Sequence, residues 1–183
     1  IAAFTATADS ITQKIIIKNL KLQKPQKYLI SPYRHNLQLK IKTVWTPKGR
    51  KQTALKFIRQ QKERSGLIYV RSRKDSKFLA NWLTNSNLKA IAYHAGITNS
   101  KRREIERDWL SGKISVVICT SAFGMGIDKS DCRFVLHYQT PELLSEYLQE
   151  IGRSGRDGKQ AIALSLISET TGILDSEAKQ RSH

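Results

Sequence analysis

Between residues 65 and 168, short apolar segments alternate with segments of helical periodicity. The apolar segments are too short for buried helices but long enough for buried strands. Two neighbouring strands can be parallel only when the chain between them has about a dozen residues or more, usually as a helix. The alternation therefore predicts an α/β fold, a parallel β-sheet with helices on both faces.

The expected elements follow from apolar periodicity and from turn residues. Strands are expected at 37–45, 67–70, 90–93, 114–119, 134–138 and 161–167. Helices are expected at 10–21, 53–64, 75–85, 100–110 and 142–151. Pro47-Lys48-Gly49 is expected to be a break before the second helix, and Phe78, Leu79, Trp82 and Leu83 are expected to face the core.

The chain is strongly basic. Its 183 residues include 32 Lys and Arg against 15 Asp and Glu, a net charge of +17. This exceeds the charge of about 2–8 that keeps a small domain soluble, so a polyanion, first of all nucleic acid, is the expected partner. Cys119 and Cys132 are too few for a zinc site or a disulfide framework, and no metal site is expected. No apolar segment is long enough to span a membrane, so a cytoplasmic protein is expected.

Polar segments follow three of the predicted strands. They are 71–74, 94–96 and 120–128, and the loop 152–158 before the last strand could lie on the same edge. Ligands of open parallel sheets gather at the carboxyl ends of the strands. The alternatives are a solvated charge run at 71–74, a core or turn histidine at His94 and a simple tight turn at 124–126.

Arg153 and Arg156 lie three residues apart where a predicted helix ends in a glycine-rich loop. The planar fork of donors on each arginine matches the oxygens of a phosphate, although closely spaced arginines are usually surface charge. The segment Gly124–Ser130 is not a Walker A loop, because Ile127 and Asp128 interrupt the required Gly-Lys-Ser. The sequence therefore offers two guanidinium groups that could contact a phosphate but no loop that would anchor one.

Together these segments resemble the second motor domain of a superfamily 2 helicase, and most closely that of the RecQ family. The resemblance consists of motif III at 4–8, motif IV at 68–73, a short motif at 93–96, motif V at 117–128 and motif VI at 149–158. The combination of Ala122–Lys129 with Tyr93–Gly96 separates RecQ-like patterns from DEAD-box patterns. The resemblance implies a RecA-like parallel sheet without its own P-loop. It also implies an ATP-dependent, 3′–5′ DNA helicase that acts in recombination and repair.

The resemblance also implies roles for individual residues. Arg153 and Arg156 would be arginine fingers, Gln149 would help to position the water or the phosphate, and Gly126 and Asp128 would line the nucleotide side of the cleft. Thr5 and Thr7 would couple hydrolysis to domain movement. Four residues would contact the tracking DNA strand or transmit the nucleotide state to it: Ser72, Arg73, His94 and Thr120.

The resemblance divides the chain into three parts. Residues 1–25 would end the first motor domain, 26–167 would form the helicase C-terminal domain, and 168–183 would be a polar tail. ATP with Mg²⁺ would be held mainly by the first motor domain, so this chain alone is expected to be inactive. The expected partners are that domain and DNA, single-stranded or at fork junctions, in the bacterial cytoplasm or nucleoid or in a eukaryotic nucleus. A non-enzymatic nucleic-acid-binding module and a DEAD-box-like RNA helicase domain remain the alternatives.

Overall fold

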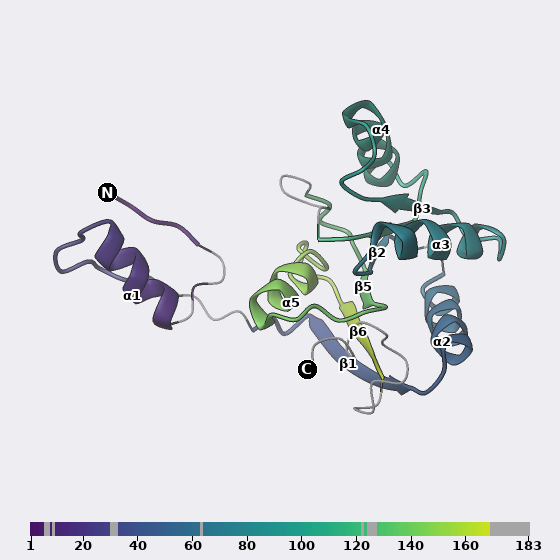
Figure 1. The fold of residues 1–183 in the computed structure, drawn as a ribbon, viewed down its shortest axis with the longest axis horizontal. Coiled ribbons are helices and arrows are strands. Elements are labelled where there is room, and N and C mark those ends of the chain that lie inside the picture. Colours follow the sequence, from purple (N-terminus) through teal and green to yellow (C-terminus); the bar gives the residue numbers. More distant parts are fainter. Residues whose placement is uncertain are drawn as a thin grey trace, which may run out of the picture.

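A parallel six-stranded sheet forms the centre of the protein, with strand order β1-β6-β5-β2-β4-β3 (Figure 1). The computed structural model describes residues 1–5, 8, 10–29, 33–62, 64–121, 123 and 128–168. The expected α/β fold with a parallel sheet is confirmed. All five strand pairings are parallel. A helix provides the return connection between each pair of consecutive strands except the fourth and fifth, between which the described residues form no helix.

The elements lie close to the predicted positions. The strands are β1 (Leu37–Val44), β2 (Gly66–Tyr69), β3 (Ala90–Tyr93), β4 (Val116–Cys119), β5 (Phe134–His137) and β6 (Ala161–Ser168). The helices are α1 (Ser10–Asn19), α2 (Pro47–Gln60), α3 (Arg73–Thr84), α4 (Asn99–Leu110) and α5 (Leu144–Ile151).

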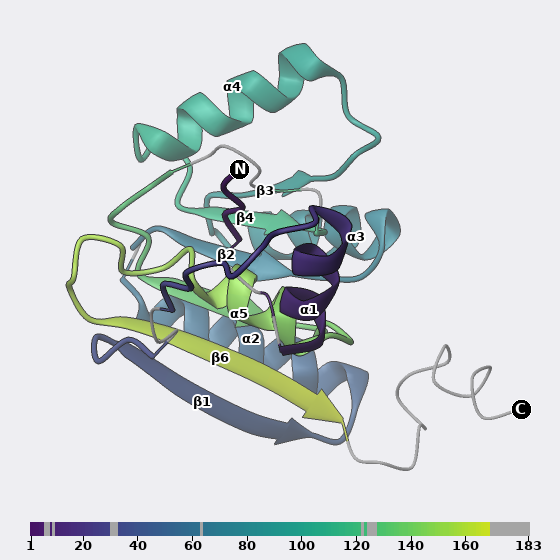
Figure 2. The same ribbon diagram turned by 90° about the vertical axis from the view of Figure 1, so that its left-hand side faces the viewer.

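Two apolar layers cover the faces of the sheet. On one face, alternate strand residues such as Ile68 and Ile118 pack with side chains of α2 and α3. On the other face, the intervening residues such as Leu67 and Val117 pack with Ile105 and Trp109 of α4 and with Ile151 of α5. Figure 2 shows α5 in front of the sheet and α2 behind it. The alternation of side chains along each strand thus builds two separate cores.

Two details differ from the sequence prediction. Pro47 is not a break but the first residue of α2, where its missing N–H costs nothing, and the Thr46 hydroxyl caps the helix by accepting from the Gly49 N–H. Phe78 is exposed, because the face that α3 buries against the sheet holds Ser76, Leu79, Ala80 and Leu83.

Helix α1 stands apart from the rest of the described chain (Figure 1) and has no buried residue. Its Ile11 and Ile15 are 66% and 52% exposed. None of the helices in the described ranges has both the length and the apolar character needed to cross a membrane.

Gly66 begins β2 at a position that has no space for a side chain. A Cβ there would overlap the ring of Phe134 on neighbouring β5, which is fully buried. The ring is in turn held edge-on against Phe57 of α2, at 5.5 Å between centroids. The absence of a side chain at Gly66 therefore allows α2 and the central strands to pack together.

We expect Gly66→Ala to lower the free energy of unfolding by about 2–3 kcal/mol, because a well-packed core resists extra atoms. Urea denaturation of the chain measures this cost. The matched test is Gly66→Ala combined with Phe134→Leu, which removes the overlapping ring atoms. The double variant should lose clearly less stability than the sum of the two single variants. Additive losses would show that the Phe134 ring is not what excludes a side chain at Gly66.

Candidate functional site

The carboxyl ends of β2, β4 and β3 lie next to one another. Tyr69 and Tyr93 both pair with Cys119 of the intervening strand β4. The residues that follow these strands are therefore neighbours on one edge of the sheet. Three of the four segments that were expected to share an edge, 71–74, 94–96 and 120–128, begin there.

Arg73 and His94 meet above Gly96. A Cβ on Gly96 would lie 3.2 Å from both Arg73 NH1 and His94 Nδ1, which is tighter than an ordinary contact, so the glycine eases this approach. The His94 Nδ1 accepts a hydrogen bond of 3.1 Å from the Gly96 N–H, which leaves the ring proton on Nε2. Burial, and then the positive charges of Lys77, Arg73 and Arg102, lower the pKa of His94 below 6.5. The result is a neutral imidazole among cations.

Ser72 lies beside this cluster, but its hydroxyl is already engaged. It caps α3 by accepting from the Asp75 N–H at 3.0 Å and donates to the Asp75 carboxylate at 2.8 Å. Arg71 donates through Nε and NH2 to the Thr140 carbonyl, which fastens the loop after β5. Thr120, at the end of β4, is half-buried, and its carbonyl accepts from the Phe123 N–H.

The loop 152–158 does not lie on this edge, and that expectation was wrong. Its Gly155 N–H donates to Cys132, and Asp157 bonds to Arg133 at 2.6 Å, both just before β5 begins. Asn36, just before β1, donates to the Gly155 carbonyl at 2.7 Å. The loop therefore lies at the amino ends of β1, β5 and β6. The chain direction already implied this position, because a loop that precedes a strand of a parallel sheet lies at the amino end of that strand.

Arg156 and Asp128 form an ion pair at 2.9 Å. Arg156 also donates through Nε to the Gly152 carbonyl, so two contacts hold its side chain over the loop. The side chains remain 39% and 69% exposed. The structure thus brings together two residues that the sequence placed on the nucleotide side of the cleft, and it leaves the guanidinium accessible.

Arg153 lies in different surroundings from Arg156. It is half-buried. Burial raises the pKa of Tyr69 and of Cys119 on the sheet face below α5, and the positive charge of Arg153 opposes this rise. Gln149 is exposed on α5.

Of the predicted coupling residues, Thr5 is exposed. Thr7 and the predicted nucleotide-side residue Gly126 lie outside the described residues.

A buried contact that the sequence did not suggest fixes α5 to the sheet. His137, the last residue of β5, bonds through Nε2 to the Glu150 carboxylate at 2.8 Å, and its other nitrogen lies 3.4 Å from the Ser165 hydroxyl. The imidazole also stacks on Tyr69. Glu150 lies two residues before Gly152, the first residue of the loop 152–158, which we call the arginine loop. This contact therefore fixes the position at which the arginine loop begins. A buried pair so far apart in sequence leaves no local signal.

An acidic cavity of ≈ 420 Å³ opens between the carboxyl ends of β2 and β5 and the start of α5. Arg71 and Gln139 line it together with three carboxylates, those of Glu142, Glu146 and Glu150. These glutamates were not singled out from the sequence, because Glu142 and Glu146 belong to no phosphate-binding pattern and Glu150 was given no role within its motif. Their charge makes the cavity unsuited to a nucleic-acid backbone.

The residues of the arginine loop suit the phosphates of a nucleotide but not its metal ion. Arg153 and Arg156 offer only cationic donors, which match phosphate oxygens. Mg²⁺ prefers carboxylate and other oxygen ligands, and the carboxylates of Asp128 and Asp157 beside these arginines are already paired with Arg156 and Arg133. Within the described ranges, no group of three or more His, Cys, Asp or Glu side chains could hold a metal ion.

Comparison with known proteins agrees with this arrangement. Residues 49–158 match the family described as helicase conserved C-terminal domain. The chain is 48% identical over 180 residues to an ATP-dependent DNA helicase RecQ from Synechocystis. The matched region covers 98% of the chain and 38% of that protein. It is 40% identical to a protein of the same name from Pasteurella multocida, over 90% of the chain and 26% of that protein.

Among solved structures, S. cerevisiae Dbp5 bound to RNA and ADP BeF3 shares the fold. The TM-score is 0.79 at 20% identity, over 91% of this chain and 44% of the other. The chain therefore spans well under half of the length of each of these three proteins. It belongs to the helicase conserved C-terminal domain family, and within that family to the RecQ-type helicases of superfamily 2.

Proposed function

We propose that this chain is the second RecA-like motor domain of an ATP-dependent DNA helicase. In this proposal the helicase moves 3′ to 5′ and unwinds DNA, single-stranded or at forks, during recombination and repair in the cytoplasm or nucleus. Residues 1–25 would complete the first motor domain, and 26–167 would form the second. The proposal takes DNA rather than RNA as the substrate because the most similar relatives described above are DNA helicases.

The observation that carries the proposal is the exposed guanidinium of Arg156, held on Asp128 in a chain that has no phosphate-anchoring loop. In the proposal, another domain supplies the phosphate that this group would contact. Bound ATP with Mg²⁺ would supply the reactive phosphoryl group, and the first motor domain would hold it. The chain alone would then be inactive.

Exchange of Asp128 for a phosphate would cost Arg156 little. Both side chains of this ion pair are exposed beyond a third, and such pairs contribute only about 0–1 kcal/mol. The freed fork could then stabilise charge that develops on the phosphate oxygens in the transition state. Arg153 would add a second positive charge, Gln149 would position the water, and Thr5 and Thr7 would couple this event to domain movement.

At the carboxyl edge, Arg73 and His94 would contact the tracking strand. Arg73 supplies charge for a phosphate, and the neutral His94 supplies an N–H donor at Nε2. Thr120 directly follows β4, the strand between β2 and β3, and would contribute its hydroxyl. Ser72 would act mainly by positioning Arg73 at the start of α3, since its hydroxyl is used by Asp75.

In the full-length protein, we expect Arg156→Ala to lower kcat of DNA-stimulated ATP hydrolysis by about a thousandfold, because arginine fingers act on the transition state. The dissociation constant for DNA should change little. Arg156→Lys, which keeps the charge but loses the fork, should also be severely impaired. The matched control is Arg107→Ala, an arginine 75% exposed on α4, which should keep normal turnover. Normal turnover in Arg156→Ala would exclude the arginine-finger role.

We expect NMR titration to give His94 a pKa below 6.5, because burial and three nearby cations disfavour its charged form. Its contribution to stability is therefore complete above pH 6.5 and is lost as the pH falls toward the folded-state pKa. Lys77→Gln should raise the pKa of His94, whereas Lys40→Gln on distant β1 should not. A His94 that titrates at or above 6.5 in the folded chain would contradict the neutral donor described here.

A further inference from the structure

A second cavity, of ≈ 290 Å³, opens at the amino ends of β2 and β4, between the ends of α2 and α3. We call it the amino-edge pocket. Ile58, Leu88 and Val116 form its apolar floor. Four cationic side chains line it: Arg59, Lys62, Arg64 and Lys89. Neither the arginine loop nor the cluster of Arg73 and His94 takes part in it.

The four cations have no described acidic partner. None of them forms an ion pair with any carboxylate in the part of the chain that the structure describes. The nearest acid in the sequence, Glu63, lies outside the described residues. Even if Glu63 is counted, the net charge of the four cations and this one acid is +3.

The helix ends beside the pocket explain only part of this charge. α2 and α3 both end here, and each helix C-terminus carries about half a negative charge. Arg59 is used in this way, because its NH2 donates to the Ser86 carbonyl just beyond α3 at 3.4 Å. For Lys62, Arg64 and Lys89 the structure shows no side-chain partner among the described residues. The pocket is therefore left with uncompensated positive charge.

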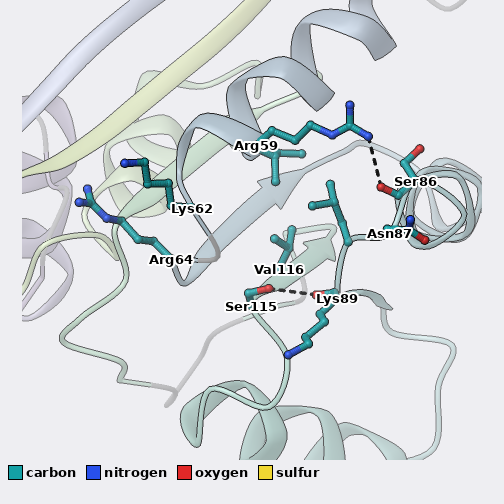
Figure 3. Close-up of a pocket in the computed structure, with 10 residues that line it drawn as sticks. Arg59, Lys62, Arg64, Ser86, Asn87, Lys89, Ser115 and Val116 are labelled. Carbon is teal, nitrogen blue, oxygen red and sulfur yellow. Dashed lines mark hydrogen bonds between the residues drawn. The ribbon is translucent and has the colours of Figure 1, made fainter.

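The cations are spread along the edge and do not converge on one point. In Figure 3 the Arg59 side chain extends toward Ser86, whereas Lys62 and Arg64 extend to the other side of the pocket and Lys89 lies below it. A single small anion would contact only some of them. A chain of phosphates along the edge could contact all of them. The spacing thus favours a nucleic-acid backbone over a free phosphate compound.

We propose that the amino-edge pocket is a second binding site for the phosphate backbone of nucleic acid. It lies at the amino end of β4, whereas Thr120 follows the carboxyl end. The pocket would therefore contact a different stretch of the nucleic-acid strand from the stretch at Arg73 and His94, or it would contact the other nucleic-acid strand. The choice of nucleic acid as ligand rests on the proposed function. The site itself rests only on the charges and the cavity.

The test compares two double variants of the 183-residue chain with equal changes in charge. Arg64→Gln with Lys89→Gln alters the pocket at two side chains that form no hydrogen bond or ion pair within the described part of the chain. Lys40→Gln with Lys42→Gln alters two exposed lysines on edge strand β1. Fluorescence anisotropy with a labelled thymidine oligomer of about 20 nucleotides measures affinity from low to high salt. Thermal melting checks that each variant is folded.

The pocket variant should reduce the slope of log affinity against log salt by about 1.4, since each lost phosphate contact on a single strand contributes about 0.7. This corresponds to a loss of affinity of about 25-fold near 100 mM salt, relative to 1 M. The Lys40 and Lys42 variant should change the slope much less. Equal effects of the two double variants would overturn the proposal, because they would show general charge attraction only.

Two competitors identify the ligand. Pyrophosphate at the same concentration of phosphate should displace the oligomer poorly. If it competes as well as unlabelled oligomer, the pocket binds small phosphate compounds, and the proposal is wrong. The second competitor is polyglutamate. If it displaces the oligomer from the parent chain but not from the pocket variant, the pocket binds an acidic protein segment, and the proposal is again wrong.

Arg73→Gln separates this proposal from the proposed function. If Arg73→Gln weakens binding and the pocket variant does not, the second site is refuted and the track at the carboxyl edge stands. If the parent chain does not bind the oligomer at any salt concentration, both are refuted.

Discussion

The burial of the central strands on both faces is the constraint on which the rest of the structure depends. β2, β4 and β5 are covered by α2 and α3 on one side and by α4 and α5 on the other. Charged groups cannot remain on these faces without a partner, so they gather at the two edges where the strands begin and end. The candidate contacts to the DNA strand lie at the carboxyl edge, and the arginine loop and the amino-edge pocket lie at the amino edge.

Helix α5 connects the two edges. It begins near the acidic cavity at the carboxyl ends of the strands and leads into the arginine loop. The contact between His137 and Glu150 fixes the end of α5 to β5, and Arg34 and Asn36 hold the carbonyls of the loop beyond it. Gly155, with φ +60, provides the left-handed turn that these contacts require. Arg156 thus extends from a loop whose backbone is held from several sides.

The sequence predicts most of the fold because its information is local. Short apolar runs separated by helical segments specify the strands, the helices and their parallel arrangement. The start of α2 was missed because Pro47 can either break a helix or begin one, and the Thr46 cap decides between them. The edge occupied by residues 152–158 was misjudged although chain direction determines it, because a loop that precedes a strand of a parallel sheet lies at the amino end of that strand. Trp109 on α4 is 2% exposed and packs edge-on against Phe123, which is a contact between distant segments.

The central claim is that Arg156 is one side of an active site divided between two domains. A structure of the full-length protein with DNA, ADP and beryllium fluoride tests it most directly. The account predicts that the Arg156 guanidinium has left Asp128 and lies about 3 Å from the fluoride that replaces the γ-phosphate. If Arg156 still pairs with Asp128 and neither it nor Arg153 lies near the nucleotide, the claim is contradicted.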